Sequence, residues 1–111
     1  MEELADRKCE ACRRDAPLAT EEQIRVLSLQ LPEWEVVEIS DTQRLMRAFS
    51  FNNFVEAIEF TNRVGAIAEE EGHHPAILTE YGSVTVSWWS HKIKGLHVND
   101  FIMAARTERV I

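Results

Sequence analysis

The sequence predicts an α+β domain in which helices cover one face of a four-stranded antiparallel sheet, in the order α-β-β-α-β-β-α. Three observations lead to this prediction. Residues 34–51 and 76–89 each contain two alternating segments around a turn, which is the pattern of a β-hairpin. A long amphipathic segment, 53–71, separates the two hairpins, and shorter helical patterns stand at 20–30 and 98–108. An antiparallel sheet with one apolar face needs such helices to cover it.

The first helix, about 20–30, is predicted from its capping residues. Thr20 followed three positions later by Gln23 matches a capping box, in which each side chain satisfies a free N–H group at the helix start. Apolar residues at helical spacing follow, and Pro32 ends the segment.

The first hairpin is predicted to have strands at 34–40 and 44–51, with residues 41–43 as its turn. Side chains alternate between the two faces of a strand. The second strand therefore presents one largely apolar face, formed by Leu45, Phe49 and Phe51 with Arg47 between them.

The long helix is predicted to begin at Asn52 or Asn53, with Glu56 in the capping-box position, and to end at Gly72. Helical spacing predicts its buried stripe as Phe54, Ala57, Ile58, Thr61, Val64 and Ala68. Three glutamates, 69–71, crowd its last turn, where the helix dipole disfavours negative charge. Two interpretations stay open: a solvated acidic end, or a carboxylate wanted beside the histidines that follow.

The second hairpin brings histidines together. Its strands, 76–81 and 84–89, are joined by Gly82-Ser83, and a type II′ turn there places Ile77 opposite Trp88 and His74 opposite His91. His73 lies at the same open end of this hairpin.

The last helix, 98–108, is predicted to start at His97 or Asn99, with Asp100 in its first turn. An acidic residue is favoured at that end of a helix, so capping and a role in a functional site are alternatives for Asp100. His97 is expected to make a structural hydrogen bond in the loop before the helix.

Composition and charge limit the classes of function. The 111 residues are predicted to form one domain, 18–111, preceded by a charged arm, 1–17. The net charge of -7 disfavours a nucleic-acid partner, because phosphate contacts need clustered Lys and Arg. No apolar run is long enough to span a bilayer and no signal peptide is visible, so a cytoplasmic protein without a membrane partner is expected.

The two cysteines, Cys9 and Cys12, form a lone C-x-x-C in the arm. This is half of a zinc-ribbon site without its second half, and it does not stand at the strand-to-helix junction of a redox motif. Two ordinary thiols in a reducing compartment are the favoured interpretation, with a metal or redox role as the alternative.

Three of the four histidines, His73, His74 and His91, thus form a candidate site. Histidine is the side chain best suited to exchange protons near neutral pH, so acid/base chemistry or small-molecule binding is favoured. A metal site is an alternative, although adjacent histidines in an extended segment point to opposite sides and no H-x-x-x-H pattern is present. Neither cysteine has a plausible link to the histidines, so covalent catalysis has no candidate nucleophile.

These residues, with their spacing, resemble the signature of the pterin-4a-carbinolamine dehydratases: Glu69-x-x-x-His73-His74-Pro75, Tyr81, His91 and Asp100. The resemblance covers residue 18 to the end, and it extends to Leu31-Pro32-x-Trp34, Phe49-x-Phe51 and Gly95-Leu96. Cys9-Glu10-Ala11-Cys12-Arg13 and residues 84–91 resemble the bacterial branch associated with phenylalanine hydroxylase. Two departures are Gly72, where some members carry an acidic residue, and Trp89-Ser90, where animal members carry small polar residues.

The resemblance implies dehydration of 4a-hydroxytetrahydropterin to quinonoid dihydropterin, which recycles the pterin cofactor of an aromatic amino acid hydroxylase. A base takes the N5 proton and an acid protonates the departing hydroxyl, so the pterin is the substrate and no metal or redox cofactor is expected. The site residues implied are His73 and His91 for proton transfer, His74 for orienting the pterin, and Glu69, Trp34 and Asp100 for binding it.

The resemblance also implies partners and alternatives. Family members form dimers or tetramers, so a homo-oligomer is expected, and phenylalanine hydroxylase is a candidate partner. Animal members also serve as a dimerisation partner of a homeodomain transcription factor, and homologous domains occur beside molybdenum-cofactor enzymes. A non-catalytic dimerisation or pterin-binding module is therefore the alternative to the enzyme, beside a metal-dependent hydrolase.

Overall fold

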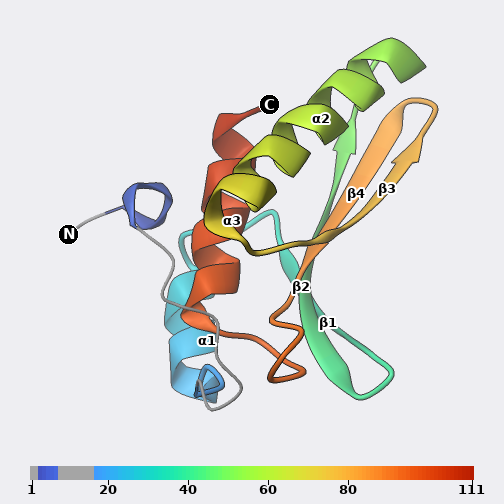
Figure 1. The fold of residues 1–111 in the computed structure, drawn as a ribbon. Coiled ribbons are helices and arrows are strands. Elements are labelled where there is room, and N and C mark those ends of the chain that lie inside the picture. The colour runs from blue at the N-terminus through green and yellow to red at the C-terminus, as the bar shows by residue number, and fades with distance from the viewer. Residues whose placement is uncertain (1–2, 8–16) are drawn as a thin grey trace.

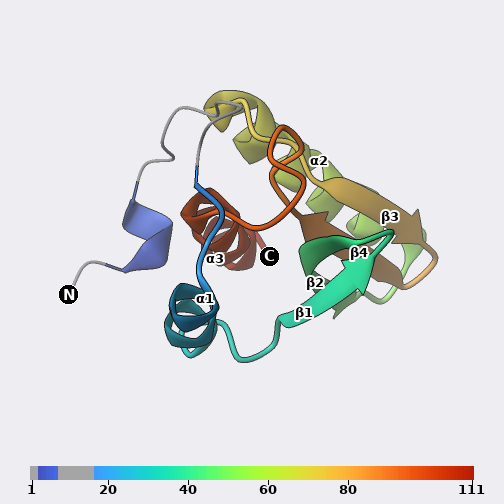
Figure 2. The ribbon, with the colours of Figure 1, turned by 90° about the horizontal axis from the view of Figure 1, so that it is seen from below.

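A four-stranded antiparallel sheet in the strand order β1-β2-β4-β3 forms one layer of the fold (Figure 1). In the computed structural model, which describes residues 3–7 and 17–111, the strands are β1 (Glu35–Ile39), β2 (Thr42–Ser50), β3 (Ala76–Glu80) and β4 (Ser83–Trp88). The helices α1 (Glu21–Ser28), α2 (Phe54–Glu71) and α3 (Val98–Arg109) lie on one side of the sheet (Figures 1 and 2). The α+β fold and the order of its elements are confirmed, and a short 3-10 helix, η1 (Leu4–Asp6), precedes them.

The helices begin where the capping residues predict. Both bonds of the first capping box form: the backbone N–H of Gln23 donates to Thr20 Oγ1 at 3.1 Å, and the backbone N–H of Thr20 donates to Gln23 Oε1 at 2.9 Å. Asn53 is the N-cap of α2, and its side-chain oxygen accepts the backbone N–H of Glu56 at 2.9 Å. His97 is the N-cap of α3. Local chemistry thus sets all three helix starts.

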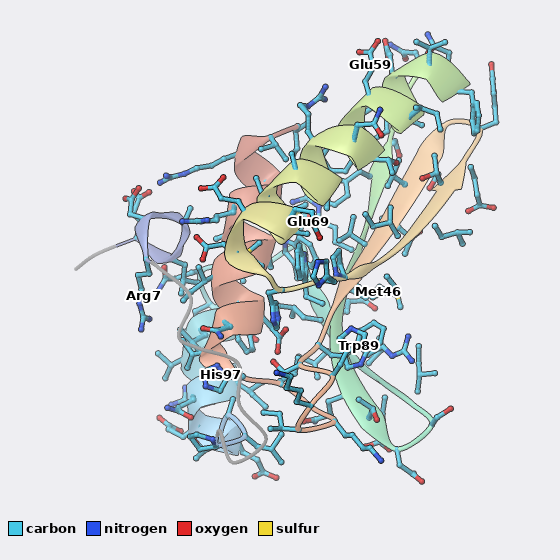
Figure 3. All side chains as sticks on the ribbon, in the orientation of Figure 1. Arg7, Met46, Glu59, Glu69, Trp89 and His97 are labelled. Carbon is cyan, nitrogen blue, oxygen red and sulfur yellow. The ribbon has the colours of Figure 1, made fainter. Side chains whose placement is uncertain are left out.

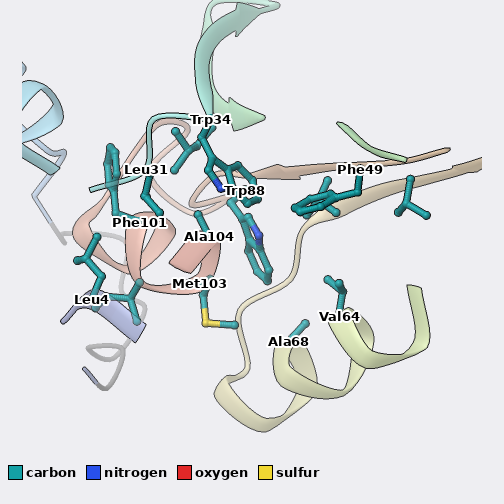
Figure 4. Packing of buried hydrophobic residues seen from close by; sticks show 14 of the residues in the cluster. Leu4, Leu31, Trp34, Phe49, Val64, Ala68, Trp88, Phe101, Met103 and Ala104 are labelled. Atoms are coloured by element: carbon teal, nitrogen blue, oxygen red, sulfur yellow. The ribbon is translucent and has the colours of Figure 1, made fainter. Parts of the chain in front are cut away.

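The core fills the space between the sheet and the helices (Figure 4). Leu45 and Phe49 of β2 are buried there, as predicted, and meet the inward residues of β4, Val84, Val86 and Trp88. The helix stripe is partly different from the prediction, because α2 buries Ala57, Phe60, Val64 and Ala68.

The predicted stripe of α2 was wrong at Phe54 and Ile58, which are 46% and 38% exposed. Phe60 is fully buried instead, with its ring centroid 4.8 Å from that of Phe49 and 5.1 Å from that of Phe51. Both stripes fit the helical repeat, and the aromatic rings of Phe49 and Phe51 select the one that contains Phe60.

Both hairpin turns differ from the predicted ones. Ser40 and Asp41, with φ angles of 51° and 63°, form a two-residue turn, so β2 already begins at Thr42. Two successive positive φ angles are those of a type I′ turn, whose twist matches that of the strands. In the second hairpin Gly82, with φ of 78°, is the last turn residue and Ser83 already belongs to β4.

This shift changes the predicted register of the second hairpin. Ile77 pairs with Val86 rather than with Trp88, and the ladder ends at the pair of Ala76 and Ser87. The prediction placed Gly82 at the first of the two turn positions, whereas a positive φ at the second position alone is typical of a type II turn. His74 therefore does not face His91 across a strand pair.

The segment that contains η1 lies against α3. Leu4 is buried, and the guanidinium of Arg109 pairs with Glu3 and Asp6, each at 2.7 Å. The hydrogen bond from Arg109, with its charge, lowers the pKa of Asp6 below the ordinary value of 3.8. The cysteines of the predicted arm, Cys9 and Cys12, fall outside the described residues, and the boundary between arm and domain stays a prediction.

The strands β1 and β3 form the two edges of the sheet. Leu78 on β3 is 58% exposed, and Tyr81 in the adjoining turn is 77% exposed. An open edge with apolar side chains is a surface on which another chain can pair, and the homo-oligomer stays a prediction. In the part of the chain that the structure describes, no helix combines the length and the apolar character needed to cross a bilayer.

Candidate active site

A pocket of about 240 Å³ opens between the end of α2 and the loop that follows β4. It is lined by Gly72, His73, His74, His91 and Lys92. The three histidines singled out in the sequence therefore border one pocket. They meet there because the loop after β4 turns back toward the chain that enters β3, and not through the strand pairing that the sequence predicted.

Gly72 ends α2 and redirects the chain into the pocket. It adopts the left-handed conformation, with φ of 63°, and its N–H donates to the carbonyl of Glu69 at 3.2 Å. The N–H of His73 donates to the carbonyl of Ala68 at 3.1 Å, which completes a Schellman motif. The chain leaves the helix extended, so His73 turns inward and is 5% exposed while His74 faces solvent.

His73 is held by a buried carboxylate. Its Nε2 lies 2.6 Å from Oδ1 of Asp100, whose side chain is fully buried. The other oxygen, Oδ2, accepts the hydroxyl of Ser90 and the backbone N–H of His97, each at 2.9 Å. With the carboxylate of Asp100 as the acceptor, the Nε2–H group of His73 donates this hydrogen bond. The ring nitrogen left for the pocket is Nδ1.

In the structure Asp100 both caps α3 and contacts a histidine of the pocket. As the third residue of α3 it completes a capping box with His97, whose Nδ1 accepts the backbone N–H of Asn99 at 3.0 Å. The same carboxylate binds His73 through its other oxygen. His97 thus makes the structural hydrogen bond expected of it, and the start of α3 supplies the group that orients the pocket histidine.

Two residues that support His73 were not predicted. Trp88 is fully buried and lies parallel to the His73 ring, with the centroids 5.8 Å apart and the planes inclined by 3°. Its indole N–H donates to Thr107 Oγ1 at 3.0 Å, and this fixes the plane of the ring. The sequence could have indicated Trp88, because a buried tryptophan needs a partner for its indole N–H. It could not have indicated Ser90, whose role depends on a contact between separate segments of the chain.

His74 pairs with the first glutamate of the acidic helix end. Its Nε2 lies 2.6 Å from Oε1 of Glu69, and the two side chains are 58% and 80% exposed. Glu71 pairs instead with Arg106 of α3 at 2.7 Å, while Glu70 is exposed. Each of the two interpretations of this acidic end is therefore right for a different residue. An exposed contact of this kind adds little to stability.

His91 reaches the pocket from a four-residue turn. Backbone hydrogen bonds between Ser90 and Gly95 close this turn, and Lys94 within it has a positive φ of 53°. The Nε2–H of His91 donates to the carbonyl oxygen of His74 at 3.0 Å. The ring of His91 also packs on the indole of Trp89, with 4.3 Å between their centroids.

Trp34 is not among the residues that line this pocket. It is buried in the core (Figure 4), where its ring centroid lies 5.8 Å from that of Phe49. Its indole N–H donates to Glu108 Oε2 at 3.1 Å, and Arg47 binds the same oxygen at 2.6 Å. Within residues 3–7 and 17–111, no three His, Cys, Asp or Glu side chains come together as a possible metal site.

Comparison with known families covers almost the whole domain. Residues 17–110 match the family model described as pterin 4 alpha carbinolamine dehydratase. The chain belongs to this family. The matched residues include both hairpins, the helices α1, α2 and α3, and every residue that borders the pocket.

Bacterial relatives in the dehydratase family match along their full length. A protein of Nitrosococcus oceani is 61% identical over 111 residues, which cover 100% of this chain and 98% of that protein. One of Syntrophotalea carbinolica is 59% identical and covers 100% and 99%. Both carry the name "Putative pterin-4-alpha-carbinolamine dehydratase".

Two solved structures share the fold at low sequence identity. A transcriptional coactivator/pterin dehydratase from Brucella melitensis superposes with a TM-score of 0.76 at 24% identity, covering 85% of this chain and 98% of its own. A pterin dehydratase-like protein described as a RuBisCO assembly factor in the alpha-carboxysome gives 0.59 at 20%, covering 70% and 88%.

All three imidazole rings at the pocket of this family member make their contact through the same ring nitrogen. In each ring Nε2 meets an oxygen: the Asp100 carboxylate for His73, the Glu69 carboxylate for His74, and the His74 carbonyl for His91. The Nδ1 atoms are then the ring nitrogens left for a ligand. A neutral imidazole with an unprotonated Nδ1 can accept a proton, and its protonated form can donate one.

Proposed function

We propose that this protein dehydrates 4a-hydroxytetrahydropterin to quinonoid dihydropterin and water by histidine acid/base catalysis. The observation that carries the proposal is the His73 ring, which a fully buried Asp100 holds at 2.6 Å beside a pocket that also contains His91. Membership of the family supplies the class of substrate. The geometry supports the proposal because two imidazole rings, His73 and His91, border one pocket.

The reaction needs one proton removed and one proton delivered. The N5–H bond of the pterin breaks and its proton goes to a base, while the electron pair forms the C4a=N5 double bond. The C4a–O bond breaks as an acid protonates the hydroxyl, which leaves as water. No electrons leave the pterin, and the two protons balance. A pair of imidazoles in opposite protonation states meets this requirement near neutral pH.

We assign the base to His73 and the acid to His91. A carboxylate behind an imidazole stabilises the imidazolium that forms when the ring takes a proton, as in Ser-His-Asp triads. Asp100 has this place behind His73, so the proton from N5 would arrive at His73 Nδ1. Because Asp100 is fully buried, we assign it to positioning His73 rather than to binding the pterin.

The exposed pair of His74 and Glu69 binds and orients the pterin ring in this proposal. The pocket volume of about 240 Å³ lies just below the range of about 300–1,000 Å³ that is common for small-molecule sites. In this proposal the bicyclic ring of the pterin enters the pocket. Recycling of the pterin used by an aromatic amino acid hydroxylase, with phenylalanine hydroxylase as the partner enzyme, completes the proposal.

A second candidate function is a binding module without turnover. One structural neighbour is titled a transcriptional coactivator/pterin dehydratase and the other is described as a RuBisCO assembly factor, so the fold occurs in proteins given roles beyond dehydration. Against this alternative stands the His73 ring, which Asp100 holds at the wall of a pocket that also contains His91. A pure adaptor has no use for histidines arranged around a pocket in this way.

The deciding experiment follows the ultraviolet absorbance of chemically generated 4a-hydroxytetrahydropterin, with and without the protein, in the presence of a chelator. We expect faster decay that survives chelation, and a fall of more than about tenfold for His73→Ala and for His91→Ala, the contribution of a general acid or base. Near-wild-type rates in both folded variants would refute the assignment. Loss of acceleration on chelation would point to a metal site instead.

A matched pair of variants separates the binding role from nonspecific effects of charge. Glu69→Gln removes the carboxylate that holds His74, and we expect it to raise KM. Glu70→Gln makes the same change at the exposed neighbouring position, and we expect no effect. Equal behaviour of the two variants would remove Glu69 from the site. No acceleration by the folded wild-type protein, together with retained pterin binding, would favour the binding module.

A further inference from the structure

His91 has little to hold its ring in place. It is exposed and opens the turn closed by Ser90 and Gly95, and with the described residues its ring makes one hydrogen bond, from Nε2 to the carbonyl oxygen of His74. A ring tied through one atom can still swing about that contact. A histidine that transfers protons needs a fixed direction, because the contribution of a catalytic group falls steeply when it is displaced.

Trp89 supplies a second contact on the ring. It follows Trp88, the last residue of β4, and because Trp88 points into the core, Trp89 turns to the other side of the sheet. There it is half-buried, and its ring lies 4.3 Å from the His91 ring at a tilt of 32°. Figure 3 shows Trp89 beside β2, near Met46.

Arg44 of β2 holds Trp89 from the same side of the sheet. Its neighbour Leu45 points into the core, so Arg44 lies on the face away from the helices, where its guanidinium carbon is 3.9 Å from the centroid of the Trp89 ring. Its Nε is buried and has no hydrogen-bond partner among the described residues. Buried donors are almost always hydrogen-bonded in native proteins, so an unpaired Nε is unusual. We take it as a sign that the cation–π contact with the indole, and not a hydrogen bond, holds the guanidinium in place.

We propose that Arg44 and Trp89 are positioning residues that hold the His91 ring in a fixed direction at the pocket. The two consecutive tryptophans then contact different histidines. Trp88 lies parallel to His73 on the inner face of the sheet, and Trp89 packs on His91 on the outer face. One strand end thereby supports both proton-transfer groups. The kinetic part of this inference rests on the proposed dehydration, and the position of the ring does not.

The position of the ring is tested by nuclear magnetic resonance of the histidine side chains. Trp89→Leu removes the aromatic ring, and we expect the carbon-bound protons of His91 to lose their ring-current displacement while those of His97 stay in place. Trp89→Phe restores an aromatic face and is expected to restore part of the displacement. Arg44→Met removes the guanidinium at similar size, and we expect the His91 signals to broaden or split as the ring samples more directions.

Kinetics give the second readout. We expect Trp89→Leu and Arg44→Met to lower kcat by about tenfold or more with KM changed by less than about twofold, because His91 acts on the reacting atoms and not on uniform binding. Trp89→Phe is expected to keep most of the rate. The control is Arg25→Met, which removes the same charge from an exposed arginine that pairs with Glu22 in the neighbouring turn of α1.

Three results would overturn the inference. The first is wild-type His91 signals and kcat in both Trp89→Leu and Arg44→Met. The second is a rise in KM with unchanged kcat, which would make Trp89 a substrate contact. The third is an equal loss in the Arg25→Met control. If Trp89→Leu does not fold, Trp89→Phe and Arg44→Met decide alone. If the wild-type protein does not dehydrate the pterin, the proposed function fails while the resonance measurements still decide the positioning.

Discussion

Exchange of Asp100 for asparagine tests how the His73 ring is used. The change keeps the size of the side chain and replaces one oxygen by an NH2 group. Two donors, the hydroxyl of Ser90 and the backbone N–H of His97, already claim Oδ2, so the remaining oxygen of the amide stays with them. The NH2 group then meets Nε2 of His73 at a position that was 2.6 Å from Oδ1. Two N–H donors cannot share that space, so His73 must move its proton to Nδ1.

The expected losses differ for rate and for stability. A His73 ring with its proton on Nδ1 cannot accept the N5 proton there, so we expect a rate lower by about 10²–10⁴-fold, the full contribution of a general base. Three hydrogen bonds to a charged group become bonds to a neutral amide, which lowers each by about 1 kcal/mol and the total by about 3 kcal/mol. Domains are stable by about 5–15 kcal/mol, so Asp100→Asn should still fold.

The assay combines the decay of 4a-hydroxytetrahydropterin with nitrogen-detected resonance of the His73 ring, which reports the tautomer directly. Asp41→Asn is the matched control, because Asp41 is exposed in a turn with positive φ that asparagine tolerates. We expect the control to keep the rate and the tautomer. A folded Asp100→Asn protein with the rate of the control would refute the reasoning, as would an unchanged tautomer.

Further predictions concern stability and acid. Ser90→Ala removes one of the three donors to Asp100, and we expect a loss of about 1–3 kcal/mol in urea unfolding with a smaller fall in rate than Asp100→Asn gives. Gly72→Ala places a Cβ at a φ of 63°, and we expect about 1–2 kcal/mol lower stability by the same measurement. The pKa of Asp6 is lowered in the fold, so its contact with Arg109 stabilises above the ordinary value of 3.8 and is lost as the pH falls through the lower folded value. The protection of the η1 amides, measured as their exchange rate relative to the intrinsic rate at the same pH, should therefore fall in acid and in high salt, and unchanged protection would contradict this.

The sequence predicts best what neighbouring residues decide among themselves. The capping box of Thr20 and Gln23, the N-cap at Asn53 and the stop at Gly72 need only a few consecutive residues, and the structure has all of them. The α+β fold follows from the alternation and helical spacing of longer segments. These features depend on local periods that tertiary contacts reinforce here rather than override.

The register of the second hairpin and the buried stripe of α2 were harder to predict, because in each case the local sequence fits two arrangements equally well. Gly82 supplies its positive φ at either position of a two-residue turn, and the choice moved the partner of Ile77 from Trp88 to Val86. The stripe of α2 fits the helical repeat with or without Phe60, and only the contacts of Phe60 with two other aromatic rings decide. Neither choice is visible in a few neighbouring residues.

The sequence singled out the three histidines that border the pocket, and it did not single out the residues that hold them in place. The residues that border the pocket carry imidazole groups whose chemistry is plain from the sequence. The groups that hold them, such as Ser90 and Trp88, act through contacts between segments far apart in the chain. Trp34 shows the opposite error, since an aromatic residue expected at the site belongs to the core around Phe49 and Glu108.

The double use of Asp100 affects how relatives of this protein can be judged. The same carboxylate caps α3 and orients His73, so a relative that has lost its activity still needs an acid there to start its last helix. Selection for folding alone can keep this aspartate, whereas the exposed His91 starts no helix. When a homologue is sorted into enzyme or adaptor by its residues, the histidine at position 91 is therefore the more informative marker, and the aspartate is a marker of the fold.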